Sequence, residues 1–151
     1  MKASCSSGQL TASGVPFTLL ALYATSARKP KLLQVIIGCS DATPTATSAL
    51  FAIRFITAAG TGTAGVTFAL NKSNGAPSVT AVINHTGEPT YQTGDPIEIP
   101  LNMSSTAIWQ PPLEDAAPES NLSTGTVIGI GIQMITGPTA KDYNVSVTWE
   151  E

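Results

Sequence analysis

The sequence predicts an all-β protein, an antiparallel β-sandwich of jelly-roll-like type with about eight or nine strands. Three observations support this fold class. Apolar runs of strand length recur along the chain, turn residues separate them, and no stretch keeps a helical period over three turns. The 151 residues have the length of one ordinary domain and include 13 Gly and 11 Pro, with Ser and Thr at most polar positions. This composition favours strands and turns over helices.

Nine apolar runs mark the expected strands. They cover residues 17–25, 31–39, 48–58, 65–71, 78–85, 96–102, 106–110, 126–135 and 143–150. Several runs alternate between apolar and polar residues, which predicts one buried face and one wet face. In the last run Val145, Val147 and Trp149 alternate with polar residues, so we expect the end of the chain to be locked into a sheet.

Two of the runs, residues 32–37 and 49–56, are apolar on both faces. Such runs predict strands that are central in a sheet or covered by a neighbouring subunit. The segments between runs, for example GTGTAG and HTGEPTYQTGDP, have the chemistry of turns and loops. A jelly roll has eight strands, so this architecture fits the count best.

The domain is expected to begin after a short N-terminal segment. Residues 1–14 hold Ser, Gly and Thr with few large apolar groups, which predicts a flexible or partner-ordered arm before a single β-sandwich domain over residues 15–151. This segment has no apolar stretch of a secretory signal. The longest apolar run, 126–135, is far below the roughly 18 residues that span a bilayer. We expect a protein made in a cytoplasm, without a membrane partner.

The charge of the chain is low. Charged residues make up 11% of the sequence, against about 25% in typical soluble domains, and the net charge is −3. A small acidic excess argues against nucleic-acid binding, whereas low surface charge is a hint of assembly. Arg28, Lys29 and Lys31 form a small basic patch. We expect this patch to be either an ionic contact for an acidic partner or a solubilising turn.

Cys39 and His85 are the residues that could form a nucleophilic dyad, because His85 is the one histidine. Neither lies in a recognisable catalytic motif. We therefore expect Cys39 to be a half-buried residue that closes a strand by packing, and His85 to be a surface residue beside a turn. Whether Cys5 and Cys39 form a disulfide stays open. One His and two distant Cys do not have zinc-ligand spacing, so no metal or other cofactor is expected.

The acidic residues Glu114, Asp115 and Glu119 gather in one loop without the D-x-D-x-D-G pattern of a calcium site. We interpret them as a solvated acidic loop. Glycosidases combine paired carboxylates with aromatic platforms, and aromatic residues are only 6% of this chain. The sequence therefore predicts no catalytic residue and no enzyme activity.

The longest irregular segment, WQPPLEDAAPESNLSTG, follows the strand predicted at 106–110. Loops longer than about 12 residues are usually functional or disordered. The two prolines stiffen this loop, and an exposed Trp suits contact with another protein. The predicted partner-binding residues are Trp109, Gln110, Pro111, Pro112 and Leu113 of this loop, together with Arg28, Lys29 and Lys31 of the basic patch.

Four segments in sequence order carry a resemblance to a known class of proteins: FTLLALYATSARKPKLLQVIIGCSDATP, SALFAIRFITAAGTGTAG, GEPTYQTGDPIEIPLN and YNVSVTWEE. They resemble small tailed-bacteriophage proteins that decorate, or cement, the capsid. The resemblance covers most of the chain and rests on segments that each combine a predicted strand with a turn. It implies a jelly-roll-like sandwich that forms a homo-dimer or homo-trimer on the outer capsid surface. It also implies that a major capsid protein of the HK97-like fold is the partner, that the host bacterial cytoplasm is the place of synthesis, and that catalytic residues are absent.

The sequence is also compatible with two other functions. A carbohydrate-binding or adhesin-like module of a phage tail or fibre would expose aromatic rings, for which Tyr91, Trp109 and Tyr143 are the candidates. A hydrolase would use Cys39 with His85, or an acidic pair. The decoration protein is the function that the sequence favours.

Overall fold

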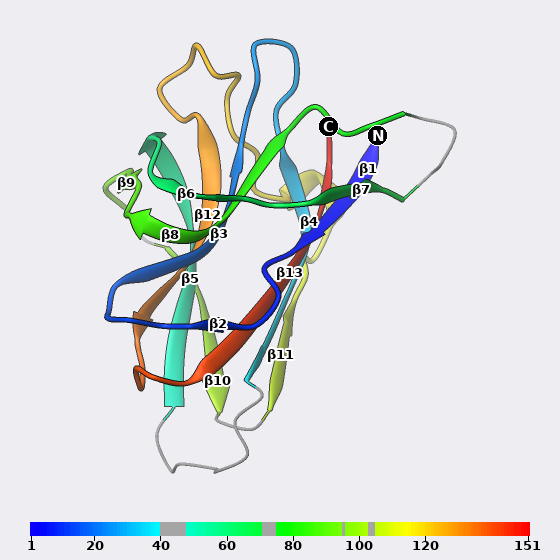
Figure 1. The fold of residues 1–151 in the computed structure, drawn as a ribbon. Helices are drawn as coiled ribbons and strands as arrows, with labels where there is room; N and C mark the ends of the chain where they lie inside the picture. Colours follow the sequence, from blue (N-terminus) through cyan, green and yellow to red (C-terminus); the bar gives the residue numbers. More distant parts are fainter. Residues whose placement is uncertain (40–47, 71–74, 95, 103–104) are drawn as a thin grey trace.

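The computed structural model describes all residues except 40–47, 71–74, 95 and 103–104. Two antiparallel sheets pack face to face, which confirms the predicted all-β sandwich (Figure 1). The strands are β1 (Lys2–Ser6), β2 (Leu10–Thr11), β3 (Phe17–Tyr23), β4 (Lys31–Cys39), β5 (Ser48–Ala58), β6 (Thr61–Ala64), β7 (Thr67–Ala69), β8 (Thr80–Gly87), β9 (Thr90–Tyr91), β10 (Ile97–Asn102), β11 (Thr106–Trp109), β12 (Gly129–Thr136) and β13 (Asp142–Glu150). A short 3-10 helix, η2, covers Glu114–Ala116.

Each of the nine predicted runs contains a strand. Four further strands in the described part of the chain, β1, β2, β6 and β9, bring the number to thirteen, so the expected eight or nine is too low. These four are short segments without an apolar run. They depend on neighbouring strands for their hydrogen bonds, which is why the local sequence does not reveal them.

The strand order within each sheet differs from the order along the chain. Sheet A has the order β11-β4-β13-β1-β7, and sheet B has the order β10-β5-β12-β3-β8-β6. The chain crosses between sheets A and B at β3 to β4, β4 to β5, and again at each step from β10 to β13, so strands from distant parts of the chain become neighbours. At one side β6 pairs with β8 in sheet B, and β7, which follows it, pairs with β1 in sheet A.

The N-terminal segment belongs to sheet A. Strand β1 lies between β13 and β7, and its Ala3 and Cys5 side chains are buried in the core. Leu10–Thr11 pairs with β13 as well. The predicted flexible or partner-ordered arm over residues 1–14 is therefore wrong for this segment. The small side chains of Ala3 and Cys5 alternate with serines, so they fill a narrow part of the core without giving a strong apolar signal.

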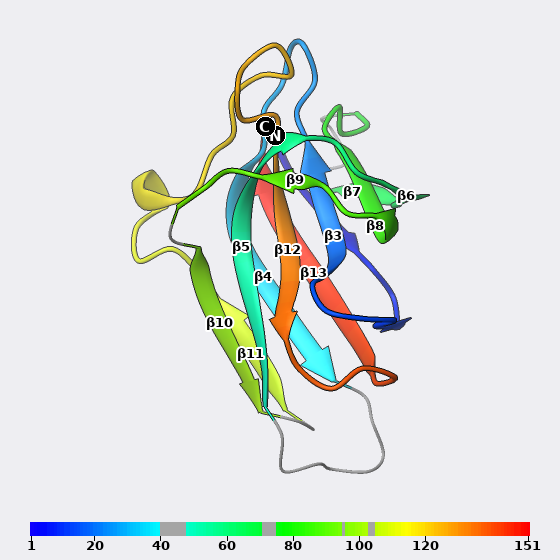
Figure 2. The same ribbon diagram turned by 90° about the vertical axis from the view of Figure 1, so that its left-hand side faces the viewer.

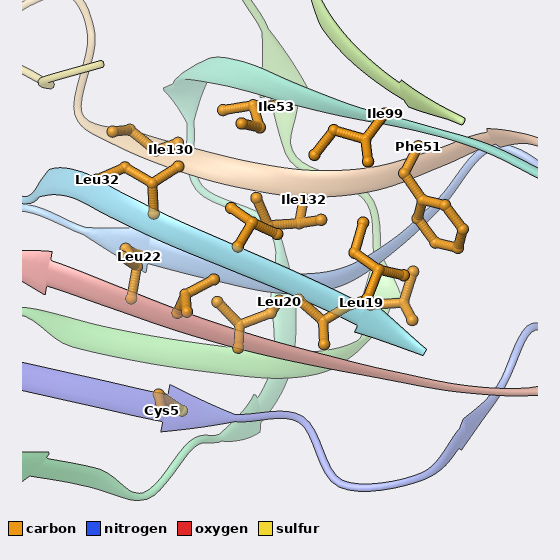
Figure 3. Packing of buried hydrophobic residues seen from close by; sticks show 14 of the residues in the cluster. Cys5, Leu19, Leu20, Leu22, Leu32, Phe51, Ile53, Ile99, Ile130 and Ile132 are labelled. Atoms are coloured by element: carbon orange, nitrogen blue, oxygen red, sulfur yellow. The ribbon is translucent and has the colours of Figure 1, made fainter. Parts of the chain in front are cut away.

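The core lies between the two sheets (Figure 3). Trp149 is fully buried on central strand β13, which confirms that the end of the chain is locked into the sheet. Phe51 and Tyr143 meet edge to face across the sandwich, with ring centroids 5.5 Å apart. Burial of each large apolar side chain contributes about 1.5–3 kcal/mol.

Burial on both faces is most complete in β3 and β12, whose residues 17–22 and 129–134 are all buried. The sequence placed this property in residues 32–37 and 49–56. That expectation is met only in part, since outward-facing residues of β4 and β5 such as Ile36 and Arg54 are half-buried. The outer side of β3 and β12 is covered by the segment between β8 and β10, which Figure 2 shows crossing these strands.

Candidate functional site

The outer surface of sheet A is the strongest candidate for contact with a partner. We call it face A and define it by the outward-facing side chains Val66, Phe68, Ser4, Ser6, Ser146, Thr148, Gln34, Ile36 and Ile108. Their neighbours along each strand, such as Ala3, Cys5 and Val147, point into the core. Period-two alternation therefore separates the two faces of sheet A cleanly.

Two cross-strand rows build face A. One row runs Phe68, Ser4, Thr148 and Gln34, and the other runs Ser6, Ser146, Ile36 and Ile108. Neither row holds a charged residue. The strands are about 4.8 Å apart, so Phe68 on β7 and Ile108 on β11 are separated by roughly 19 Å. Phe68 is 62% exposed and Ile108 is 63% exposed, so face A has apolar groups at both edges and hydroxyl groups between them.

A charged border closes one end of face A. The Lys2 ammonium on β1 donates a hydrogen bond of 2.8 Å to Glu114 Oε1, although Glu114 follows β11 at the other edge of sheet A. The hydrogen bond and the attraction to Glu114 raise the pKa of Lys2, and they lower the pKa of the Glu114 carboxyl. Both side chains are exposed, so the ion pair positions the loop more than it stabilises the fold.

The predicted contact loop lies partly on this border. Gln110 and Pro111 line a shallow pocket of about 220 Å³ with Lys2 and Glu114. Leu113 is 71% exposed beside them, and Pro112 is exposed as well. Trp109 differs from its prediction as a contact residue, because it is half-buried and packs against the core. Its alternation with outward-facing Ile108 on β11 turns the indole inward.

The predicted basic patch lies at the same end of sheet A. Arg28, Lys29 and Lys31 line a groove of about 710 Å³, together with three carboxylates, Glu119, Glu150 and Glu151. Lys29 forms an ion pair of 2.8 Å with Glu119. Lys31 is the cross-strand partner of Glu150, which connects the groove to the charged border of face A. Positive charge in this groove is therefore balanced by negative charge, and the three residues do not form an isolated basic field.

The structure does not bring Cys39 and His85 together. Cys39 is half-buried, closes β4 in sheet A and packs against the core, as predicted. His85 lies on β8 in sheet B, where Nδ1 is 3.2 Å from the Thr18 carbonyl oxygen and Nε2 is 3.4 Å from the Tyr23 hydroxyl. Cys5 and Cys39 are both free thiols.

The prediction that His85 is a surface residue is wrong, since only 4% of it is exposed. Asn84 has a left-handed backbone (φ 49°), and the register between β6 and β8 shifts at this point. This break in the alternation turns His85 onto the covered outer side of sheet B. Burial lowers the pKa of His85, because the charged imidazolium loses its hydration, and nearby Glu88 and the Thr18 carbonyl offset this only in part.

The three aromatic candidates for sugar binding do not share an open surface. Tyr143 is fully buried, and its hydroxyl donates to the Pro138 carbonyl. Trp109 is half-buried against the core. Tyr91 is half-buried beneath the Arg54 guanidinium, whose central carbon is 4.6 Å from the ring centroid.

The acidic loop is not simply solvated, since Glu114 and Glu119 both pair with lysines. Within the described ranges no group of three His, Cys, Asp or Glu side chains could hold a metal ion. No helix in that same part of the chain is long and apolar enough to cross a membrane. No known protein family matches the chain, and no curated protein or solved structure matches it either.

Proposed function

We propose that this protein is a structural protein that docks on a larger protein assembly through face A. Following the sequence resemblance, the assembly is the capsid of a tailed bacteriophage, and the docked protein bridges major capsid protein subunits from outside. The observation that carries the proposal is the composition of face A. It combines exposed apolar side chains at both edges with hydroxyl groups at the centre, and it lacks charge.

Removing such a surface from water has a low free-energy cost. Burying an unpaired charge in an interface costs far more than burying a hydroxyl that finds a new hydrogen bond. Interface centres are depleted in charged residues and carry a polar rim, a pattern that face A and its charged border match. The two apolar edges lie far enough apart to contact two capsid subunits at once. A homo-dimer or homo-trimer would multiply these contacts, so that modest affinities add up to stable attachment.

The test is co-sedimentation of the purified protein with expanded capsids that lack it, together with heat-stability curves of the shells. We expect saturable binding and a higher melting temperature of the shell. Phe68→Asp with Ile108→Asp should abolish binding, while Ile97→Asp, an exposed apolar residue on sheet B, should leave it intact. Failure of the unmodified protein to bind expanded capsids would overturn the proposal, and equal binding of both variants would remove face A as the contact surface.

A further inference from the structure

A hydrogen-bonded polar cluster, with Thr18 and Gln133 buried and Glu88 exposed, lies on the outer side of sheet B, opposite face A. We call it the Glu88 cluster, and it consists of Thr18, Arg54, Glu88, Tyr91 and Gln133. Thr18 on β3 and Gln133 on β12 are direct cross-strand partners. Thr18 is fully buried and Gln133 is 2% exposed. Glu88 and Tyr91 come from the segment that crosses these strands (Figure 2).

One carboxylate oxygen joins the Thr18 hydroxyl to the Gln133 amide. Thr18 Oγ1 donates to Glu88 Oε2 at 2.5 Å, and Gln133 Nε2 donates to the same Oε2 at 3.0 Å. The Thr18 backbone N–H donates to Glu88 Oε1 at 2.8 Å and fixes the orientation of the carboxylate. A hydroxyl group, a carboxamide and a base that could accept the hydroxyl proton are therefore held side by side.

Arg54 completes the arrangement from β5. Its Nη1 donates to Gln133 Oε1 at 2.9 Å, so a positive charge polarises the amide carbonyl. The Tyr91 ring packs against the guanidinium and keeps it in place. A cation aimed at a carbonyl oxygen stabilises the negative charge that develops there when a nucleophile attacks the carbon.

We propose that Thr18 and Gln133 form an intramolecular ester cross-link. Thr18 Oγ1 attacks the Gln133 carboxamide carbon, and the hydroxyl proton passes to Glu88. The tetrahedral intermediate carries its negative charge on Oε1, beside Arg54. Its collapse breaks the C–N bond, and Glu88 returns the proton to the leaving nitrogen. A hydroxyl and an amide become an ester and ammonia, so no oxidant, reductant or other reactant is needed.

The geometry suits both formation and survival of this bond. Directly opposed side chains on antiparallel strands have Cβ atoms about 5 Å apart, within reach of a Thr–Gln linkage. Thr18 and Gln133, the two residues that would be joined, are buried beneath the segment that carries Glu88 and Tyr91, so an ester between them would be shielded from water although Glu88 itself is exposed. The cross-link would join two central strands of sheet B that are far apart in sequence. It does not depend on the proposed docking function.

Mass spectrometry of the purified full chain tests the proposal. The intact mass should be lower than the sequence mass by about 17 Da, the mass of the ammonia lost in the acyl transfer. Trypsin should release peptide 3–28, which contains Thr18, joined to peptide 73–141, which contains Gln133. Treatment with hydroxylamine, which cleaves esters, should separate these two peptides; hydroxylamine also cleaves Asn–Gly bonds, so the released part with Gln133 should begin at Gly75.

Variants distinguish the ester from other reactions. Thr18→Val should restore the full mass, Thr18→Ser should keep the cross-link, and Glu88→Gln should slow its formation while the far-UV circular dichroism stays unchanged. Asn74 precedes Gly75, and cyclisation of such a pair also releases ammonia. A mass loss that persists in Thr18→Val, without joined peptides in the unmodified protein, would therefore overturn the proposal. Full sequence mass after prolonged incubation of the unmodified protein between pH 5 and 9 would overturn it as well.

Discussion

The outer surfaces of the two sheets differ in how far other segments of the chain cover them. Face A is open: among the residues that the structure describes, no segment covers most of its area, and most of its central hydroxyl-bearing side chains are half-buried by their neighbours in the sheet. The corresponding part of sheet B is closed by the chain itself, and the charged groups there, Arg54 and Glu88, have partners within the molecule. The outer surface of sheet A stays exposed to solvent, whereas the polar groups on the outer surface of sheet B are paired within the molecule.

Glycines explain how sheet B is closed. On β12, Gly129 and Gly131 occupy outward positions where face A has serines and threonines. A Cβ atom on Gly131 would lie 2.6 Å from the Tyr91 hydroxyl oxygen, closer than atoms approach in proteins. The absence of a side chain therefore creates the room in which the segment with Tyr91 packs against sheet B.

Among the substitutions that test the contrast between the two outer surfaces, Gly131→Val should have the largest effect on stability. The added side chain would collide with Tyr91 and displace the covering segment, which should lower the free energy of unfolding by about 1–3 kcal/mol, the cost of overpacking. Ser146→Val, the matched change on the outward side of β13 in face A, should alter it by less than about 0.5 kcal/mol. Urea denaturation measures both. Equal losses at the two positions would contradict the contrast between a closed and an open face.

A charge at the centre of face A should act on docking and leave the fold intact. Thr148 lies between Ser4 and Gln34 on central strand β13. In Thr148→Glu the new carboxylate would lose its hydration on docking, so we expect capsid binding to weaken roughly tenfold or more, about 1.4 kcal/mol. Thr148→Gln, similar in size and neutral, should bind nearly as well as the unmodified protein. If sedimentation gave both variants the same affinity, size and not charge would decide the fit.

The fold was predictable where sequence patterns are local. Runs such as 31–39 and 48–58 coincide with β4 and β5, since period-two burial and turn residues are visible in a single chain. Strand β1 was missed because Ala3 and Cys5 are small, and their burial depends on β13 and β7, which follow much later in the sequence. Long-range pairing of this kind leaves no local signal.

The candidate site was predictable only in part. The outward positions Ser146 and Thr148 follow from alternation in β13, but their rows with Ser4 and Ile108 depend on strand order. Trp109 was placed at the contact surface because of its residue type, whereas its position on β11 turns it inward. The partners of Thr18 in the Glu88 cluster could not be predicted for the same reason, because Glu88, which follows β8, and Gln133 on β12 are distant from Thr18 in the sequence.

The smallest expected effect is on the pH dependence of folding stability, and it should arise from the outer side of sheet B and not from face A. Burial holds the pKa of His85 below its ordinary value of 6.5, so the unfolded chain binds a proton more readily than the folded protein does. Folding stability should therefore be complete above about pH 6.5 and should decline as the pH falls from there towards the lower pKa of the folded state. His85→Gln should flatten this part of the stability curve in urea titrations between pH 5 and 7.5, whereas Ser146→Val on face A should leave its slope unchanged. A slope that survived in His85→Gln would assign the effect to another group and would show that closing sheet B over His85 has no influence on the pH dependence of folding.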